Sequence, residues 1–218
     1  MKIPRLLCTL MLFALMLLAI VLFLAIVLFL IIAFPSGAFA DHENPNVFVK
    51  DLVDKFLYII KFEENKDLQA EKILHLVRTS FDFPAITETL LEGLYVSDSD
   101  KSALTDLFPK LLHMRYGIFI KSPDSLTIDY ERYEFFTGGL EAVVHTRTKI
   151  PGHDLDLNYK LRHKNGNWKI YDITVGGISL VDNYRAQIHR VLSQKSFADF
   201  LTHLERIVGK KTSVLRIR

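Results

Sequence analysis

The chain has 218 residues, half of them hydrophobic, and carries 27 Lys and Arg side chains against 25 Asp and Glu. Lys2 and Arg5 are the only charged residues among the first forty, so residues 41–218 hold 25 basic and 25 acidic side chains and are formally neutral. A neutral domain lacks the basic surface of a general nucleic-acid binder. The only cysteine, Cys8, precedes residue 41, which excludes disulfides from the rest of the chain.

The first forty residues differ from the rest of the chain. An apolar run from Leu6 to Phe34 ends at Pro35-Ser36-Gly37, and Ala38-Phe39-Ala40 fits the small-x-small pattern of a signal-peptidase site. The run has 29 residues, whereas a secretory apolar region has about 7–15 and a membrane span about 20. We predict cleavage before Asp41, with an inner-membrane tether through residues 6–34 as the alternative. In both cases residues 41–218 form a domain outside the cytoplasm.

Helical patterns fill the first part of this domain. Asn44 before Pro45 predicts a capped helix with proline in its first turn. The apolar spacing then predicts helices over 46–62, 67–79, 82–93 and 101–120. The first of these has a wider apolar face than a surface helix needs. Pro109 should bend or divide the fourth helix.

Four strand patterns follow, over 125–136, 140–150, 154–163 and 168–175. Their connections are short enough for an antiparallel meander, and Asn165-Gly166 favours a type I′ hairpin turn. Two helices, 179–194 and 196–208, complete the pattern. Ser179 can cap the first, with Asp182 completing a capping box, and the basic tail from Gly209 should be frayed. The order predicts one α+β domain, with a four-stranded antiparallel sheet and about six helices.

Residues that could carry chemistry have structural interpretations that we prefer. His145, His153 and His163 show no metal-binding spacing, so we predict no metal and no cofactor. The segment 177–181 lacks the second glycine of a nucleophile elbow, which leaves Ser179 as a helix cap. Asp98 and Asp100 lack the glycine and glutamate of a calcium loop. We predict that the protein is not an enzyme.

Two further features stay open between structure and function. Gly176-Gly177 before a helix could bind a phosphate, although a tight strand-to-helix reversal requires the same glycines. Tyr171, Asp172 and Tyr184 could perform acid–base chemistry in a pocket, although packing is the commoner use of such aromatic side chains.

Two segments carry a family resemblance. The sequence Trp-Lys-Ile-Tyr-Asp-Ile at 168–173, followed by Gly-Ile-Ser-Leu-Val-Asp-Asn-Tyr-Arg-Ala-Gln-Ile at 177–188, resembles the signature region of the MlaC, or toluene-tolerance, family. Phe-Asp-Phe-Pro at 81–84 is a second, weaker match, and the similarity runs from about Val47 to Val208.

The resemblance implies a periplasmic phospholipid carrier that serves outer-membrane lipid asymmetry. It implies a diacyl phospholipid ligand, an inner-membrane ABC lipid transport complex and an outer-membrane lipoprotein partner. Transfer would follow differences in affinity, without covalent chemistry. The same resemblance implies a sheet wrapped by helices around an apolar cavity.

The apolar excess of the strands and helices is compatible with such a cavity. Each methylene buried contributes about 0.8 kcal/mol, so two tails of about 15 methylenes would favour enclosure by about 25 kcal/mol before the costs of ordering. Trp168 and Tyr171 should face opposite sides of their strand. We expect the cavity to be lined by alternate apolar residues of two strands and one helix: Leu155, Leu157, Tyr159, Leu161, Tyr171, Ile173, Val175, Val181, Tyr184 and Ile188.

A solid core would use the same apolar residues, so two rival functions stay open. One is a membrane-anchored interaction protein with a solid core. The other is a small-molecule enzyme in a related cone-shaped α+β fold. Lipid that co-purifies with the domain would separate the carrier from both rivals.

Overall fold

A computed structural model describes residues 44–116, 126–150 and 153–215, which belong to one compact unit, His42–Arg218. The leader predictions for residues 1–40 therefore lie outside the described residues. Among the residues described, no helix is both long enough and apolar enough to cross a membrane. The described helices are α2 (Pro45–Phe62), α3 (Lys66–Ser80), α4 (Phe83–Leu90), α5 (Asp98–Tyr116), α6 (Leu180–Leu192) and α7 (Phe197–Leu215).

Local capping explains where the first helices begin. The side chain of Asn44 accepts a hydrogen bond from the backbone N–H of Asn46, with Pro45 in the first turn, as predicted. Asp82 caps α4 in the same way through the N–H of Ala85. Since these bonds satisfy backbone donors that the helix cannot satisfy internally, sequence alone could locate them.

Helices α5 and α7 differ from the prediction. Helix α5 continues through the buried Pro109 and is not divided there. Helix α7 runs to Leu215, whereas we expected a frayed tail after Val208. Gly209 costs a helix about 1 kcal/mol, which is not enough to end a helix with favourable residues on both sides.

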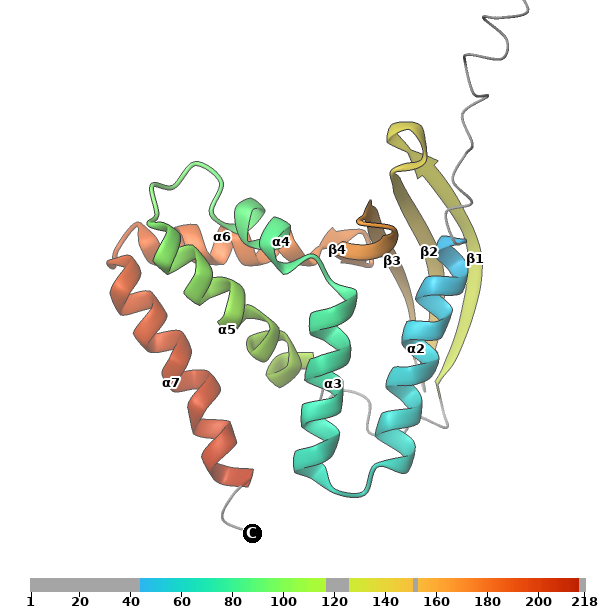
Figure 1. Cartoon of the computed structure of the whole chain (residues 1–218), viewed down its shortest axis with the longest axis horizontal. Helices are drawn as coiled ribbons and strands as arrows, with labels where there is room; N and C mark the ends of the chain where they lie inside the picture. The colour runs from blue at the N-terminus through green and yellow to red at the C-terminus, as the bar shows by residue number, and fades with distance from the viewer. Residues whose placement is uncertain (1–43, 117–125, 151–152, 216–218) are drawn as a thin grey trace, which may run out of the picture. The chain divides into compact units, whose positions relative to one another are not determined.

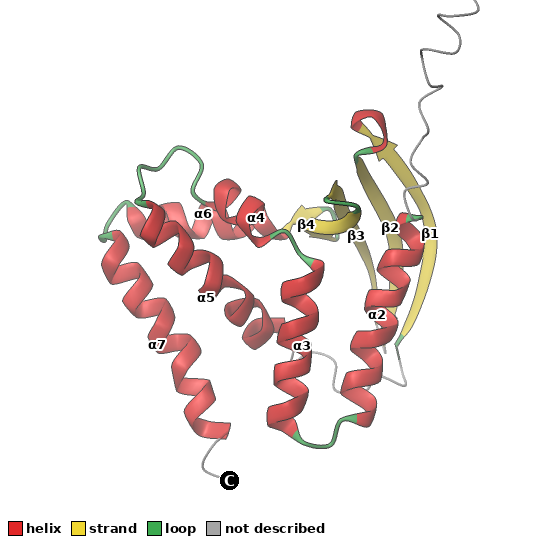
Figure 2. Cartoon of the chain, viewed as in Figure 1, coloured by secondary structure: helices red, strands yellow, loops and turns green. Residues whose placement is uncertain are grey.

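The sheet has five antiparallel strands in the order β1-β2-β3-β4-β5 (Figure 2). The strands are β1 (Thr127–Phe136), β2 (Glu141–Ile150), β3 (His153–Lys164), β4 (Asn167–Val175) and β5 (Ile178–Ser179). The prediction of four strands was short by one. Gly176 and Gly177 adopt φ values of 57° and 83°, and this turn lets two residues pair with the end of β4 before α6 begins.

Two bulges set which side chains share a face of the sheet. Between β3 and β4, Leu161 pairs with Ile170 and Lys160 with Asp172, so Tyr171 is an extra residue in β4. The side-chain alternation of β4 changes sides at this point. Between β1 and β2 the register shifts in the same way after Tyr130.

One hydrophobic cluster lies between the inner face of the sheet and α2 (Figure 1). We call it the sheet cluster; its buried members are Val49, Ala142, Val144, Tyr159, Leu161, Trp168 and Ile170. Val49 comes from the first turns of α2, whereas Ala142 and Val144 come from the start of β2. The N-terminal end of α2 is therefore packed near the β1–β2 hairpin.

A second cluster, the helical cluster, joins α4, α5, α6 and α7. Its centre is Phe108, whose ring meets Tyr184 edge to face at 5.1 Å between centroids and Phe83 at 6.4 Å. Leu90 and Leu104 are fully buried beside them. Phe81 packs against both clusters, so the hydrophobic interior of the unit has two parts that meet at this side chain.

Polar contacts connect the two clusters. The Lys164 ammonium donates to both carboxylate oxygens of Asp82 at 3.0 and 3.1 Å, which fastens the start of α4 to the β3–β4 hairpin. The carboxylate of Asp172 accepts from Lys160 Nζ at 2.9 Å and from the N–H of Val181 at 3.2 Å, which fastens β4 to α6. Buried carboxylates with such partners fix the relative placement of the elements they join.

Candidate functional site

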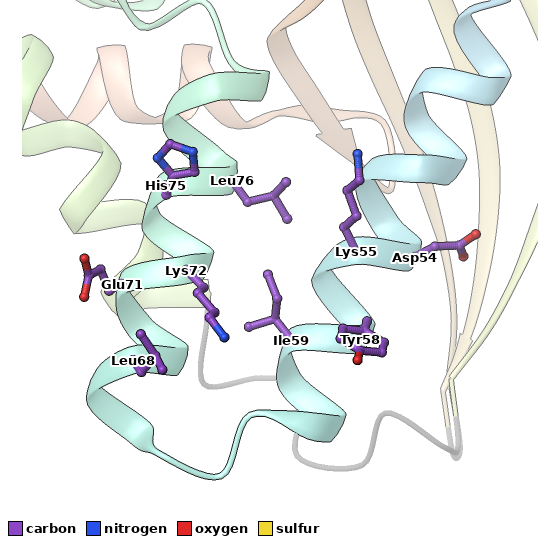
Figure 3. A pocket seen from close by; sticks show the side chains of 9 residues that line it. All are labelled: Asp54, Lys55, Tyr58, Ile59, Leu68, Glu71, Lys72, His75 and Leu76. Carbon is purple, nitrogen blue, oxygen red and sulfur yellow. The ribbon is translucent and has the colours of Figure 1, made fainter.

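An open cleft of about 610 Å³ separates α2 from α3 (Figure 3). Its residues come only from these two helices: Asp54, Lys55, Tyr58, Ile59, Leu68, Glu71, Lys72, His75 and Leu76. Ile59 and Leu76 point from facing helices into the space between them. The cleft therefore has apolar walls that are accessible from outside.

The charges at the rim of the cleft are balanced by neighbours. The Lys55 ammonium lies 2.6 Å from the Asp51 carboxylate, and that of Lys72 lies 2.5 Å from Glu63. The Lys55–Asp51 pair is exposed to solvent and contributes little to stability, whereas the Glu63 side chain of the second pair is half-buried. Both pairs provide a polar margin around an apolar interior, an arrangement that suits an amphiphilic ligand.

The helix α2 separates this cleft from the sheet cluster. Asp54 points from α2 toward the strands (Figure 3) and pairs with Lys50. Burial raises the pKa of Tyr130 on β1, and the nearby Tyr159 and Asp54 raise it further. Because α2 contacts β1, the Asp54 side of this helix faces the sheet.

Tyr159 is one of the buried polar residues of the inner face of the sheet, with Thr146 and Thr148 of β2. Burial alone raises the pKa of its hydroxyl to about 12. A neutral phenol at ordinary pH can lie against an apolar chain without the cost of a buried charge.

The ten residues expected to line a cavity are distributed over both clusters. Leu157, Tyr159, Leu161 and Ile173 belong to or pack against the sheet cluster. Val181, Tyr184 and Ile188 lie instead in the helical cluster. The two groups therefore belong to different clusters.

The other three predicted lining residues belong to neither cluster. Leu155 is half-buried and Val175 is exposed at the end of β4. The ring of Tyr171 lies 4.6 Å below the guanidinium of Arg162, on the face opposite Leu161. None of the ten lines the cleft between α2 and α3, so their role as lining residues stays a prediction.

The sequence contained one signal for the cleft. The apolar face of α2 is wider than packing on one sheet requires, and Phe56, Leu57 and Ile60 stay half-buried after α2 has docked. The alternating apolar residues of β3 and β4 led us to predict the lining residues mainly on these two strands. Both helices of the cleft are amphipathic, and nothing in a single helix shows that its neighbour leaves a space.

The residues weighed for catalysis have structural partners. Ser179 Oγ accepts from the N–H of Asp182 at 3.0 Å and caps α6 as predicted. His145 Nδ1 lies 3.0 Å from Asn158 Oδ1, and the His163 ring packs edge to face on Trp168. Across residues 44–116, 126–150 and 153–215 no group of three His, Cys, Asp or Glu side chains could hold a metal ion.

Comparison with known proteins identifies the family. A family model described as MlaC protein matches residues 50–206, which is more than half of the chain. The chain belongs to the MlaC family. The recognition from residues 168–188 is thus confirmed. No curated protein matches the chain.

A solved structure shares the fold of this MlaC-family chain. It is the phospholipid-binding protein from Ralstonia solanacearum in complex with a phospholipid, with a TM-score of 0.68 and 20% identity. The alignment covers 76% of this chain and 97% of that one. The helices and strands described above therefore follow an arrangement that also occurs in that protein.

Proposed function

We propose that this MlaC-family protein is a phospholipid carrier of the periplasm that moves lipids between inner-membrane and outer-membrane complexes and so maintains outer-membrane lipid asymmetry. One observation carries the proposal. The fold matches almost the whole of a chain that was solved with a phospholipid bound. The family match over residues 50–206 supports the same function. In this proposal the protein binds and releases lipid and catalyses no reaction.

The cleft between α2 and α3 is our candidate entrance for the acyl tails. Its apolar walls at Ile59 and Leu76 would replace water around the tails, at about 0.8 kcal/mol for each methylene buried. The paired charges at Lys55 and Lys72 would remain near a polar head group.

The proposed partners follow from this role. A carrier needs a donor and an acceptor, which we take to be an inner-membrane ABC lipid transport complex and an outer-membrane lipoprotein. No nucleic acid is involved. Net transfer would follow the difference in lipid affinity between the carrier and each complex, because binding without chemistry can only redistribute the ligand.

Lipid extraction tests the proposal. The protein is purified without detergent, extracted and analysed by mass spectrometry beside Ile59→Arg, which places a charge in the cleft wall. Val191→Arg on α6 is the matched control, because Val191 is an exposed apolar residue outside the cleft. We expect phospholipid from the wild type and from Val191→Arg, and a loss of at least fivefold from Ile59→Arg.

Circular dichroism on the same preparations separates lost binding from lost fold. A wild-type protein that yields no phospholipid would contradict the carrier function and favour an interaction protein with a solid core. A folded Ile59→Arg variant with a full lipid load would move the entrance away from α2 and α3.

A further inference from the structure

The end of the β1–β2 hairpin exposes an apolar surface that the lipid cleft does not include. Tyr133, Phe135, Phe136 and Leu140 are 38%, 48%, 47% and 50% exposed. The rings of Tyr133 and Phe135 meet edge to face at 5.4 Å. We call these four residues the tip patch.

The tip patch occupies both faces of the hairpin. Phe135 pairs with Ala142 on the inner face of the sheet and stacks on Trp168 at 6.2 Å between ring centroids. Phe136, the next residue, points to the opposite face because side chains alternate along a strand. A flat protein interface would use one face of the hairpin, whereas apolar side chains on both faces suit insertion into a lipid layer.

The tip itself carries no charge. The six residues from Phe135 to Leu140 read Phe-Phe-Thr-Gly-Gly-Leu. The nearest charges are paired along the strands behind it, with Arg132 Nε 2.9 Å from Glu134 and Arg162 lying 3.9 Å from Glu141. The uncharged tip is therefore bounded by a polar margin.

Backbone hydrogen bonds within the tip lower the free-energy cost of transferring it from water into a membrane. The N–H of Leu140 donates to the carbonyl oxygen of Thr137 at 3.3 Å, and the N–H of His163 donates to that of Leu140 at 2.7 Å. Backbone groups without a hydrogen-bond partner are strongly disfavoured in hydrocarbon. The turn satisfies part of this requirement itself.

The chain outside the described residues points to a bilayer as the occupant. An apolar run from Leu6 to Phe34, longer than the about 20 residues of a membrane span, precedes α2 by ten residues. Ten residues reach at most about 35 Å. Val49, in the first turns of α2, belongs to the same cluster as Ala142 of β2, so the start of α2 is the helix end nearer the β1–β2 hairpin (Figure 1). In the form that keeps residues 6–34, the chain joins α2 at the helix end nearer the β1–β2 hairpin, so the tether and the tip patch could reach the same membrane.

From these observations we propose that the tip patch contacts the surface of a phospholipid bilayer, with Phe136 and Leu140 inserted at the boundary between head groups and acyl chains. Phe and Leu are among the side chains that interfacial segments bury at this boundary. The contact would hold the carrier at the membrane and does not depend on lipid being held in the cleft.

Trp168 is the only tryptophan of the chain and lies beneath Phe135, so it can report the contact. The full chain is mixed with phosphatidylcholine vesicles whose acyl chains carry bromine near the head group, and the quenching of Trp168 fluorescence is measured. The test variant is Phe136→Ser with Leu140→Ser. The control is Tyr95→Ser, which alters a fully exposed tyrosine in the segment between α4 and α5.

We expect quenching in the wild type and in Tyr95→Ser, and at least a twofold reduction in the double variant with an unchanged circular dichroism spectrum. Equal quenching in all three would come from brominated lipid carried inside the protein or from the tether alone, which would overturn the tip contact and leave the carrier function standing. Absence of quenching in the wild type would also overturn the contact. A tip patch that binds a second protein and not a membrane would also give no quenching.

Discussion

The carboxylate of Asp82 and the ammonium of Lys164 meet across 82 positions of sequence, with both carboxylate oxygens within 3.1 Å of Nζ. The Asp82 side chain is buried, whereas that of Lys164 is half-exposed. Asp82 also caps α4, and its backbone N–H donates to the carbonyl oxygen of Ile170. One residue thus fastens the helical cluster to the sheet.

Lys164→Met should destabilise the unit, because it leaves the buried carboxylate of Asp82 without its cation. We expect a loss of about 2 kcal/mol of unfolding free energy, in the range for a buried group that loses a charged partner. Lys50→Met is the control, since Lys50 and Asp54 form an exposed pair worth under about 0.5 kcal/mol. Urea denaturation of both variants measures the difference, and equal midpoints would mean that Asp82 is satisfied without Lys164.

Ser179→Ala should cost about 1 kcal/mol, because it removes the acceptor for the N–H of Asp182 at the start of α6. Ser193→Ala at the other end of α6 is the control. Its hydroxyl donates to the carbonyl oxygen of Arg190 and can be replaced by water. Thermal melts followed by circular dichroism compare the two. A larger loss for Ser193→Ala would contradict the capping role of Ser179.

Leu157→Arg and Leu161→Arg should behave differently although both residues lie on the inner face of β3. Leu161 is fully buried, so an arginine there places an unpaired charge in the sheet cluster at a cost of several kcal/mol and should unfold the protein. Leu157 is half-buried at the edge of that cluster. We expect Leu157→Arg to fold and to lose bound phospholipid, as seen by circular dichroism beside lipid extraction. A folded variant with a full lipid load would remove Leu157 from the lining.

Tyr159→Phe should make the protein less sensitive to alkali. Burial raises the pKa of Tyr159 from 10 to about 12, so the unfolded chain releases this proton at a lower pH than the folded one. Stability is therefore fully retained below pH 10 and falls as the pH rises from 10 to 12, by about 3 kcal/mol. Urea titrations at pH 8 and pH 11.5 should show a smaller loss for Tyr159→Phe than for the wild type. Tyr95→Phe, at an exposed tyrosine, should match the wild type.

Cleavage before Asp41 would give a mature protein that begins Asp-His-Glu-Asn. Intact-mass analysis of the protein exported by its host should give this N-terminus. A mass that includes Met1, recovered in the membrane fraction, would instead establish the tether through residues 6–34.

The sequence by itself determined most of the elements and the starts of the helices that carry a capping side chain. Asn44, Asp82 and Ser179 cap the helices that their positions predicted, because a cap needs only the next three residues. Asn165 and Gly166 both have positive φ, as the hairpin turn between β3 and β4 requires. The family signature at 168–188 also lies within one continuous stretch.

Tertiary structure alone decided which apolar residues share a space. The bulge at Tyr171 depends on the register of β4 against β3, so alternation counted along one strand could not place Tyr171 and Ile173 correctly relative to each other. Val181 and Tyr159 were both predicted to line one cavity, yet they belong to different clusters. The cleft between Ile59 and Leu76 exists because α2 and α3 leave space between them. The apolar periodicity of one helix gives no information on its distance from another helix.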